Sequence, residues 1–294
     1  MKGKVRIAGA VVLLGAGWVA YCFLPAPFTR EVQKVEAVAA AAQTEFSDQA
    51  YATILDRYVN HDGLVDYQGL KHDRERLDSF VVTLGSLSPQ VYDQWSKQRK
   101  IAFWINAYNA LTLKAIVDHY PIRPSFFRSL VYPENSIRQI AGVWDQLRFR
   151  VMGEMLTLDE IEHQILRKRF YEPRIHAALV CAAMGCPPLR REAFIGEGLD
   201  DQLEEQSRRF LSSPGGLRID RTANQVYISS IFQWYGRDFV KGYGGSANFE
   251  KFGEIEGAVL NFISRHLSSS DREFLIGGGY SVRHLDYDWS LNEQ

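Results

Sequence analysis

Residues 96–120 constrain the fold more than any other segment, because they predict a helix with apolar side chains on nearly all sides. The apolar pattern is densest over residues 101–117, and Pro121 and Pro124 follow as stop signals. A helix that is apolar all round has to be buried all round. The sequence therefore predicts a central helix with the remaining elements packed around it.

Shorter segments on both sides of this helix mix strand and helix patterns. Residues 147–151 alternate as a strand does, residues 175–181 have the continuous apolar pattern of a buried strand, and residues 217–230 predict a hairpin. Strands and helices do not alternate regularly, which favours α+β over α/β. We therefore predict an α+β fold, a single domain over residues 46–294 in which the central apolar helix packs on a small, mainly antiparallel sheet.

The N-terminal residues read as a targeting segment. An uncharged apolar stretch at residues 7–24 is longer than the roughly 7–15 residues of a signal-peptide core and close to the roughly 20 that span a bilayer. Basic residues precede it and acids follow, which places the body outside the cytoplasm. We predict a signal anchor, a membrane-spanning helix, at residues 1–24 and a stalk at residues 25–45.

This reading makes the chain a single-pass inner-membrane protein with its body in the periplasm. The alternative is a cleaved signal peptide that leaves a secreted or periplasmic body. The sequence has 34 Lys and Arg against 35 Asp and Glu, a net charge of −1. Without a basic surface nucleic acid is excluded as a partner. The expected partners are the membrane, through the N-terminal helix, and an envelope peptide, glycan or protein.

Four segments carry an unusual number of polar residues within apolar surroundings. They are residues 103–109 (FWINAYN), 159–163 (DEIEH), 176–188 (HAALVCAAMGCPP) and 287–292 (YDWSLN). In this order, and together with residues 232–239 (FQWYGRDF), they make the chain from about residue 46 to residue 292 resemble the domain-of-unknown-function family 547. The resemblance implies little about activity, since the family is named for lacking an assigned function.

Asn106 and Asn109 lie three residues apart on the central helix, so they share a face. Unpaired amides are costly in an apolar setting, and we expect both side chains to be buried and hydrogen-bonded. One interpretation is structural, with both amides bonded to the backbone of neighbouring loops. The other is functional, with the amides orienting a catalytic imidazole or binding a substrate amide.

Cys186, Cys181 and His176 form the candidate catalytic group. In an unbroken strand His176 and Cys181 would lie about 16 Å apart on opposite faces. The loop at residues 182–185 could instead turn Cys186 towards His176 or His163, and a thiol beside an imidazole becomes a nucleophilic thiolate. A Cys181–Cys186 disulfide and a pair of inert thiols are the competing interpretations. A metal site would need paired histidines at ligand spacing, so neither metal nor cofactor is predicted.

Glu162 and His163 follow a capping box formed by Thr157 and Glu160, which predicts a helix through Arg167. His163 either forms a surface pair with Asp159, four positions earlier, or belongs to a catalytic triad in which Glu162 or Asp159 orients an imidazole.

Two carboxylates near tryptophans, Asp238 and Asp288, are expected to accept hydrogen bonds from the indole N–H groups. These are structural roles, and neither residue is placed among the candidate catalytic groups.

Two functions fit these residues. The first is a thiol-dependent hydrolase or acyltransferase acting on amides in the cell envelope, with Cys186 or Cys181 as nucleophile and His176 as base. Asn106 or Asn109 would orient the imidazole. The second is a non-enzymatic envelope binding or scaffold domain with a structural disulfide between the two cysteines.

Overall fold

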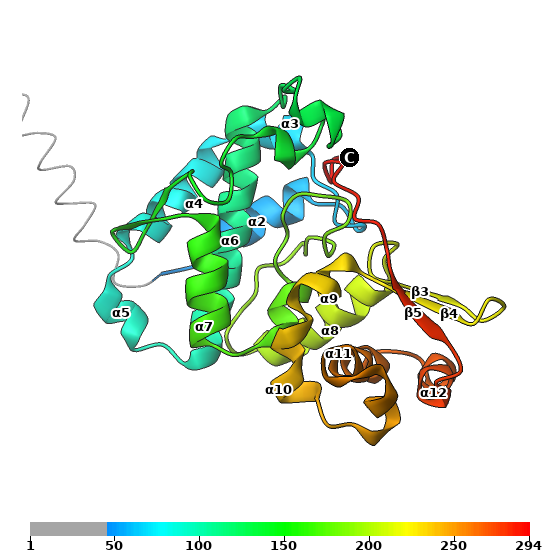
Figure 1. Cartoon of the computed structure of the whole chain (residues 1–294). Coiled ribbons are helices and arrows are strands. Elements are labelled where there is room, and N and C mark those ends of the chain that lie inside the picture. The colour runs from blue at the N-terminus through cyan, green and yellow to red at the C-terminus, as the bar shows by residue number, and fades with distance from the viewer. Residues whose placement is uncertain (1–45) are drawn as a thin grey trace, which may run out of the picture. The chain divides into compact units, whose positions relative to one another are not determined.

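The predicted central helix is present as α6, Lys97–His119. The computed structural model of the protein describes residues 46–294, and α6 lies at the centre of the first of two hydrophobic cores in them (Figure 1). The Ser96 hydroxyl caps the helix by accepting a hydrogen bond from the Arg99 N–H. Nearly every residue from Ile101 to Val117 is buried, so the prediction of a buried central helix is confirmed.

Helices, and not a sheet, surround α6. It contacts α3, α4, α8 and the π-helical turn η3. The surrounding elements are α2 (Gln49–Tyr58), α3 (Tyr67–His72), α4 (Glu75–Ser86), α5 (Pro89–Asp93), η3 (Glu160–Leu166), α7 (Arg167–Arg169) and α8 (Leu199–Ser212). The prediction that the central helix packs on the sheet was therefore wrong. Its apolar residues are spread all round, and several amphipathic helices cover them better than one flat surface could.

Two small sheets complete the α+β fold. Strands β1 (Phe149–Val151) and β2 (Glu154–Leu156) form an antiparallel hairpin. Strands β3 (Leu217–Asp220) and β4 (Gln225–Ile228) form the hairpin predicted at residues 217–230, and β5 (Ser281–His284) adds to β4 in parallel. A parallel neighbour needs a long crossover, which the helices between β4 and β5 supply.

The second core lies against the β3–β5 sheet and is built mainly from the last third of the chain. Helix α11 (Glu254–Arg265), labelled in Figure 1, contributes buried Leu260, Phe262 and Ile263 to this core. The elements between β4 and β5 are α9 (Ser230–Tyr235), η5 (Gly236–Phe239), α10 (Val240–Tyr243), η6 (Ala247–Phe252), α11 (Glu254–Arg265) and α12 (Ser269–Gly277). Tyr287, beyond β5, packs against both cores.

The buried strand predicted at residues 175–181 is absent. The short helix η4 (Pro173–Ala177) occupies its first half, and the second half is irregular. Asn109 of α6 explains this, because its amide donates to the Ala178 carbonyl (3.0 Å) and accepts from the Val180 N–H (2.9 Å). These backbone groups are satisfied by a side chain and have no need of a neighbouring strand.

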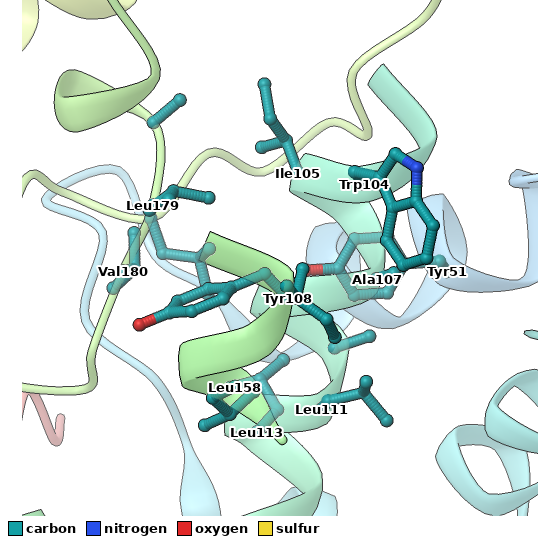
Figure 2. Close-up of a cluster of buried hydrophobic side chains, with 14 of the residues drawn as sticks. Tyr51, Trp104, Ile105, Ala107, Tyr108, Leu111, Leu113, Leu158, Leu179 and Val180 are labelled. Atoms are coloured by element: carbon teal, nitrogen blue, oxygen red, sulfur yellow. The ribbon is translucent and has the colours of Figure 1, made fainter. Parts of the chain in front are cut away.

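The side chains of this segment complete the first core. Figure 2 shows Leu179 and Val180 beside the ring of Tyr108 on α6, with Leu158 nearby. Packing of this irregular segment against α6 fixes the backbone that leads into Cys181.

The predicted membrane helix needs correction. Within residues 46–294 the structure contains no helix that is both long enough and apolar enough to span a bilayer. The segment on which that prediction rested, residues 1–24, and the predicted stalk lie outside the described residues. We therefore do not retain the single-pass membrane protein, the signal-based export or the inner-membrane and periplasmic location that the sequence suggested.

Candidate functional site

A cavity of about 480 Å³ lies where the two cores meet. Its wall contains Cys181 and Cys186, a buried histidine, three carboxylates, one arginine and six aromatic side chains. The lining residues are Tyr108, Arg138, Trp144, Asp145, Asp159, Glu162, His176, Leu179, Cys181, Cys186, Ile231, Trp234, Tyr235, Tyr287 and Trp289.

The two cysteines are free thiols that share one hydroxyl group. Tyr287 Oη lies 3.1 Å from the Sγ atom of Cys181 and 3.1 Å from that of Cys186. The backbone N–H of Cys181 also donates to Cys186 Sγ over 3.0 Å. The structure thus brings both predicted thiols together, but without the disulfide that the scaffold hypothesis required.

The C-terminal tail holds Tyr287 in this position. The N–H groups of Met184 and Gly185 each donate to a tail carbonyl over 2.8 Å, those of Ser290 and Asp288. A Cβ atom on Gly185 would lie 3.0 Å from the ring of Tyr287, tighter than an ordinary contact. Glycine at this position therefore allows the tyrosine to approach the loop closely.

These contacts separate the acidities of the two thiols. Burial raises the pKa of Cys186, but hydrogen bonds from Cys181, Tyr287 and the loop backbone outweigh it and bring that pKa below its usual value. The pKa of Cys181 is raised well above the usual value by the hydrogen bond of Cys181 to Cys186 and by burial. Of the two thiols, Cys186 is therefore the more acidic one.

His176 is buried and held from two directions. Its Nε2 atom lies 2.8 Å from Asp238 Oδ2, and its ring stacks on Tyr235 with centroids 4.3 Å apart. Arg167 makes a two-pronged ion pair with the same carboxylate, over 2.6 and 2.9 Å. With Nε2 donating to Asp238, Nδ1 is the nitrogen left to accept a proton.

Asp238 is therefore the carboxylate partner of the buried imidazole. Burial raises its pKa, but hydrogen bonds from His176 and Arg167 outweigh burial and hold it well below the usual range. The expected role as an acceptor for an indole N–H was wrong for Asp238. Asp288, the other carboxylate so interpreted, accepts from the Ser290 N–H.

His176 lines the same cavity as Cys186, but within residues 46–294 it makes no hydrogen bond to a thiol. The thiol and the imidazole are thus separate hydrogen-bonded groups on one cavity wall. The sequence suggested that the loop at residues 182–185 turns Cys186 towards a histidine. In the structure this loop places Cys186 beside Tyr287 instead.

Asn106 and Asn109 are buried and hydrogen-bonded, as predicted. Asn106 donates to Asp48 and to the Phe194 carbonyl, and it accepts from the Phe194 N–H. Both amides bind backbone, so the structural interpretation holds for their hydrogen bonds, and neither touches His176. Asn109 still affects the site, because it fixes the segment leading into Cys181.

The predicted capping box is present, with reciprocal hydrogen bonds between Thr157 and Glu160 of 2.8 and 3.1 Å. Beyond it, Glu162 is buried and lines the cavity. His163 is partly exposed and is absent from the cavity wall; its Nδ1 atom lies 3.0 Å from Arg167. Glu162 therefore belongs to the site, whereas His163 lies beside it.

Several lining residues had no part in the predicted site, namely Tyr287, Tyr235 and Arg138. Tyr287 and Tyr235 stand within segments that carried the family resemblance, and this was the available signal. Arg138 belongs to a short turn, η2 (Ile137–Gln139), with no motif around it.

The described residues contain no group of three or more His, Cys, Asp or Glu side chains arranged to hold a metal ion.

The fold and the site define an α+β domain with a hydrogen-bonded cysteine pair in an aromatic cavity. Residues 92–211 match the family described as "Protein of unknown function, DUF547". The chain thus carries a DUF547 region, which confirms the resemblance over residues 92–211. This region includes α6, His176 and both cysteines, while Asp238 and Tyr287 lie beyond it. Neither the curated proteins nor the solved structures gave a match.

Proposed function

We propose that the domain is a thiol-dependent hydrolase or acyltransferase that acts on amide bonds, with Cys186 as the nucleophile. One observation carries the proposal: Cys186 lines the cavity, and its Sγ atom accepts the Cys181 N–H and lies 3.1 Å from the Tyr287 hydroxyl. These donors favour the thiolate, the reactive form of cysteine. An inert buried thiol lies in apolar surroundings without such donors, which raises its pKa.

In the proposed reaction the Cys186 thiolate attacks the carbonyl carbon of the amide. A carbon–sulfur bond forms, and the carbon–nitrogen bond breaks to release an amine, which takes up a proton. Water, or an amine acceptor, then attacks the thioester and releases the thiolate. In this proposal His176 serves as proton donor and acceptor, since Asp238 holds its Nε2 atom and leaves Nδ1 for this role.

The first test is the reaction of the purified protein with iodoacetamide over a range of pH. We expect labelling of Cys186 with a midpoint below the ordinary thiol value of about 8.5. Tyr287→Phe removes one donor to the thiolate, so the midpoint should rise. Tyr227→Phe is the matched control, because the Tyr227 hydroxyl contacts Gln225 on the same strand.

The second test uses p-nitrophenyl acetate, whose leaving group needs no proton. We expect a burst of one equivalent of p-nitrophenolate and an acetyl group on Cys186, and Cys186→Ser should abolish both. His176→Ala should keep the burst but slow the steady-state rate, because water attack on the thioester requires a base. Steady turnover by Cys186→Ser at the wild-type rate would sink the proposal.

The alternative is a binding domain without turnover. The lack of a hydrogen bond between His176 and either thiol favours it. If mass spectrometry showed Cys181 and Cys186 bridged and unlabelled until reduction, the domain would lack its nucleophile, and this alternative would take first place.

A further inference from the structure

Arg138 lines the cavity without an acidic partner. Within residues 46–294 its guanidinium makes no ion pair, and its Nε atom is buried with no hydrogen-bond partner. Arg174 and Arg190 are paired instead: Arg174 contacts three carboxylates, and Arg190 contacts two. A cation that is partly removed from water is less stable without a counter-charge. Its presence in the cavity points to an anion supplied by a ligand.

Three aromatic rings hold the guanidinium in place. Its Cζ atom lies 4.4 Å from the ring centre of Trp289, 4.7 Å from Tyr132 and 5.2 Å from Trp144. Such cation–π contacts use the face of the guanidinium plane and consume none of its N–H donors. Arg138 is therefore oriented in advance with its donors unspent, which favours two-pronged binding of a carboxylate.

The cavity wall also contains carboxylates, which affect whether an anion can bind there. Asp145, Asp159 and Glu162 line it, yet none lies within ion-pair distance of Arg138. Burial raises the pKa of Asp159. Arg138 is the positively charged side chain among the lining residues, so it is the group that would attract an anion into this cavity.

A short series of contacts joins Arg138 to the nucleophile. Trp289 packs against Tyr287, with ring centroids 4.6 Å apart, and Tyr287 reaches Cys186 Sγ over 3.1 Å. Two aromatic side chains thus separate the guanidinium from the thiol. A substrate that spans the same wall could place one group at each end.

We propose that Arg138 binds a carboxylate of the substrate, so that the amide attacked by Cys186 carries a free carboxylate a few bonds from the scissile carbonyl. The substrate class would be peptides or acylated amino acids with an unblocked acid group. This inference rests on the proposed function for the position of the reacting bond. The carboxylate site itself stands on Arg138 and its surroundings.

The experiment compares alkylating agents that differ only in charge. N-iodoacetylglycine and N-iodoacetyl-γ-aminobutyrate are tested against their carboxamides, and the readout is the ratio of the two rates at Cys186. We expect the carboxylate to be preferred by about tenfold or more at one linker length, the size expected for a charged hydrogen bond. Arg138→Gln should bring the ratio close to one, and Arg138→Lys should leave it between these values.

Arg123→Gln is the matched control, because Arg123 is exposed and does not line the cavity. It should keep the wild-type ratio. Equal rates for acid and amide at every linker length, or a preference that survives in a folded Arg138→Gln protein, would overturn the inference. Thermal melting shows whether each variant is folded.

A second measurement does not need the thiol and separates the two failures. Tryptophan fluorescence is followed while N-acetylglycine or N-acetylglycinamide is added to the wild-type protein and to Arg138→Gln. The acid alone should change the fluorescence, and only with Arg138 present, because Trp144 and Trp289 contact its guanidinium. If Cys186 proves unreactive but this response is seen, the proposed enzyme fails while the carboxylate site stands.

Discussion

The buried polar groups of α6 and those of the cavity wall differ in how far their hydrogen bonds are used. Asn109 and Asn106 each bind both the C=O and the N–H of a neighbouring segment, so their amides are committed within the protein. Arg138 has an Nε donor without a partner, and both Arg138 and Cys186 line the cavity. Satisfied polar groups build the framework, and unsatisfied ones mark where a ligand is expected.

The largest effect on stability is expected for Asn109, whose amide is fully hydrogen-bonded within the protein. Asn109→Leu would leave the Ala178 carbonyl and the Val180 N–H without partners, and each costs about 1–3 kcal/mol. We expect a loss of roughly 2–6 kcal/mol in unfolding free energy, measured by chemical denaturation. Asn248→Leu, at an exposed position, should change it by less than about 0.5 kcal/mol. Equal stability of wild type and Asn109→Leu would break the comparison.

An intermediate effect on stability is expected for Asp238, which forms an ion pair with Arg167 and a hydrogen bond with His176 of the site. Its folded-state pKa is lowered, so its stabilising contribution is present above the unfolded pKa of about 3.9 and is lost as the pH falls below that value. Asp238→Asn should therefore cost about 1–3 kcal/mol at neutral pH, and the difference from wild type should shrink below about pH 4. Melting curves between pH 3 and pH 7 measure this difference.

The matched control for that pH dependence is Asp62→Asn, because Asp62 is exposed. It should follow the wild-type curve throughout. A constant gap between Asp238→Asn and wild type down to pH 3 would show that the carboxylate does not gain its stability from His176 and Arg167.

The smallest effect on stability is expected for His163→Ala. This variant also tests whether His163 or His176 belongs to the site. His163 is partly exposed and absent from the cavity wall, so His163→Ala should change stability by no more than about 0.5 kcal/mol. Acetyl transfer by Cys186 should be unchanged, in contrast to His176→Ala. Loss of turnover in His163→Ala would move the catalytic base and contradict the cavity assignment.

The parts of the fold that follow from local rules could be predicted from the sequence. The apolar run of α6, the capping box before η3 and the hairpin of β3 and β4 are set by neighbouring residues. The segment at residues 175–181 could not be predicted, because its apolar pattern fits a strand while Asn109, about 70 positions earlier, takes its backbone hydrogen bonds.

The candidate site divides in the same way. Cys186, Cys181, His176 and Glu162 stand out by residue type and all four line the cavity. Their partners are set by tertiary packing, and no local pattern reveals them. The carboxylate partner of His176 was also not predicted, because Asp238 lies 62 residues further along the chain in a segment that was interpreted as structural.

The dependence of Cys186 on Tyr287 has a consequence for the newly made chain. Tyr287 follows Cys186 by 101 residues, so the ribosome makes the cysteine long before its hydroxyl donor exists. Until residue 287 is made and the tail lies against residues 182–185, Cys186 has the reactivity of an ordinary thiol. Under the proposed function, completion of the chain and docking of the tail would be the step that activates Cys186.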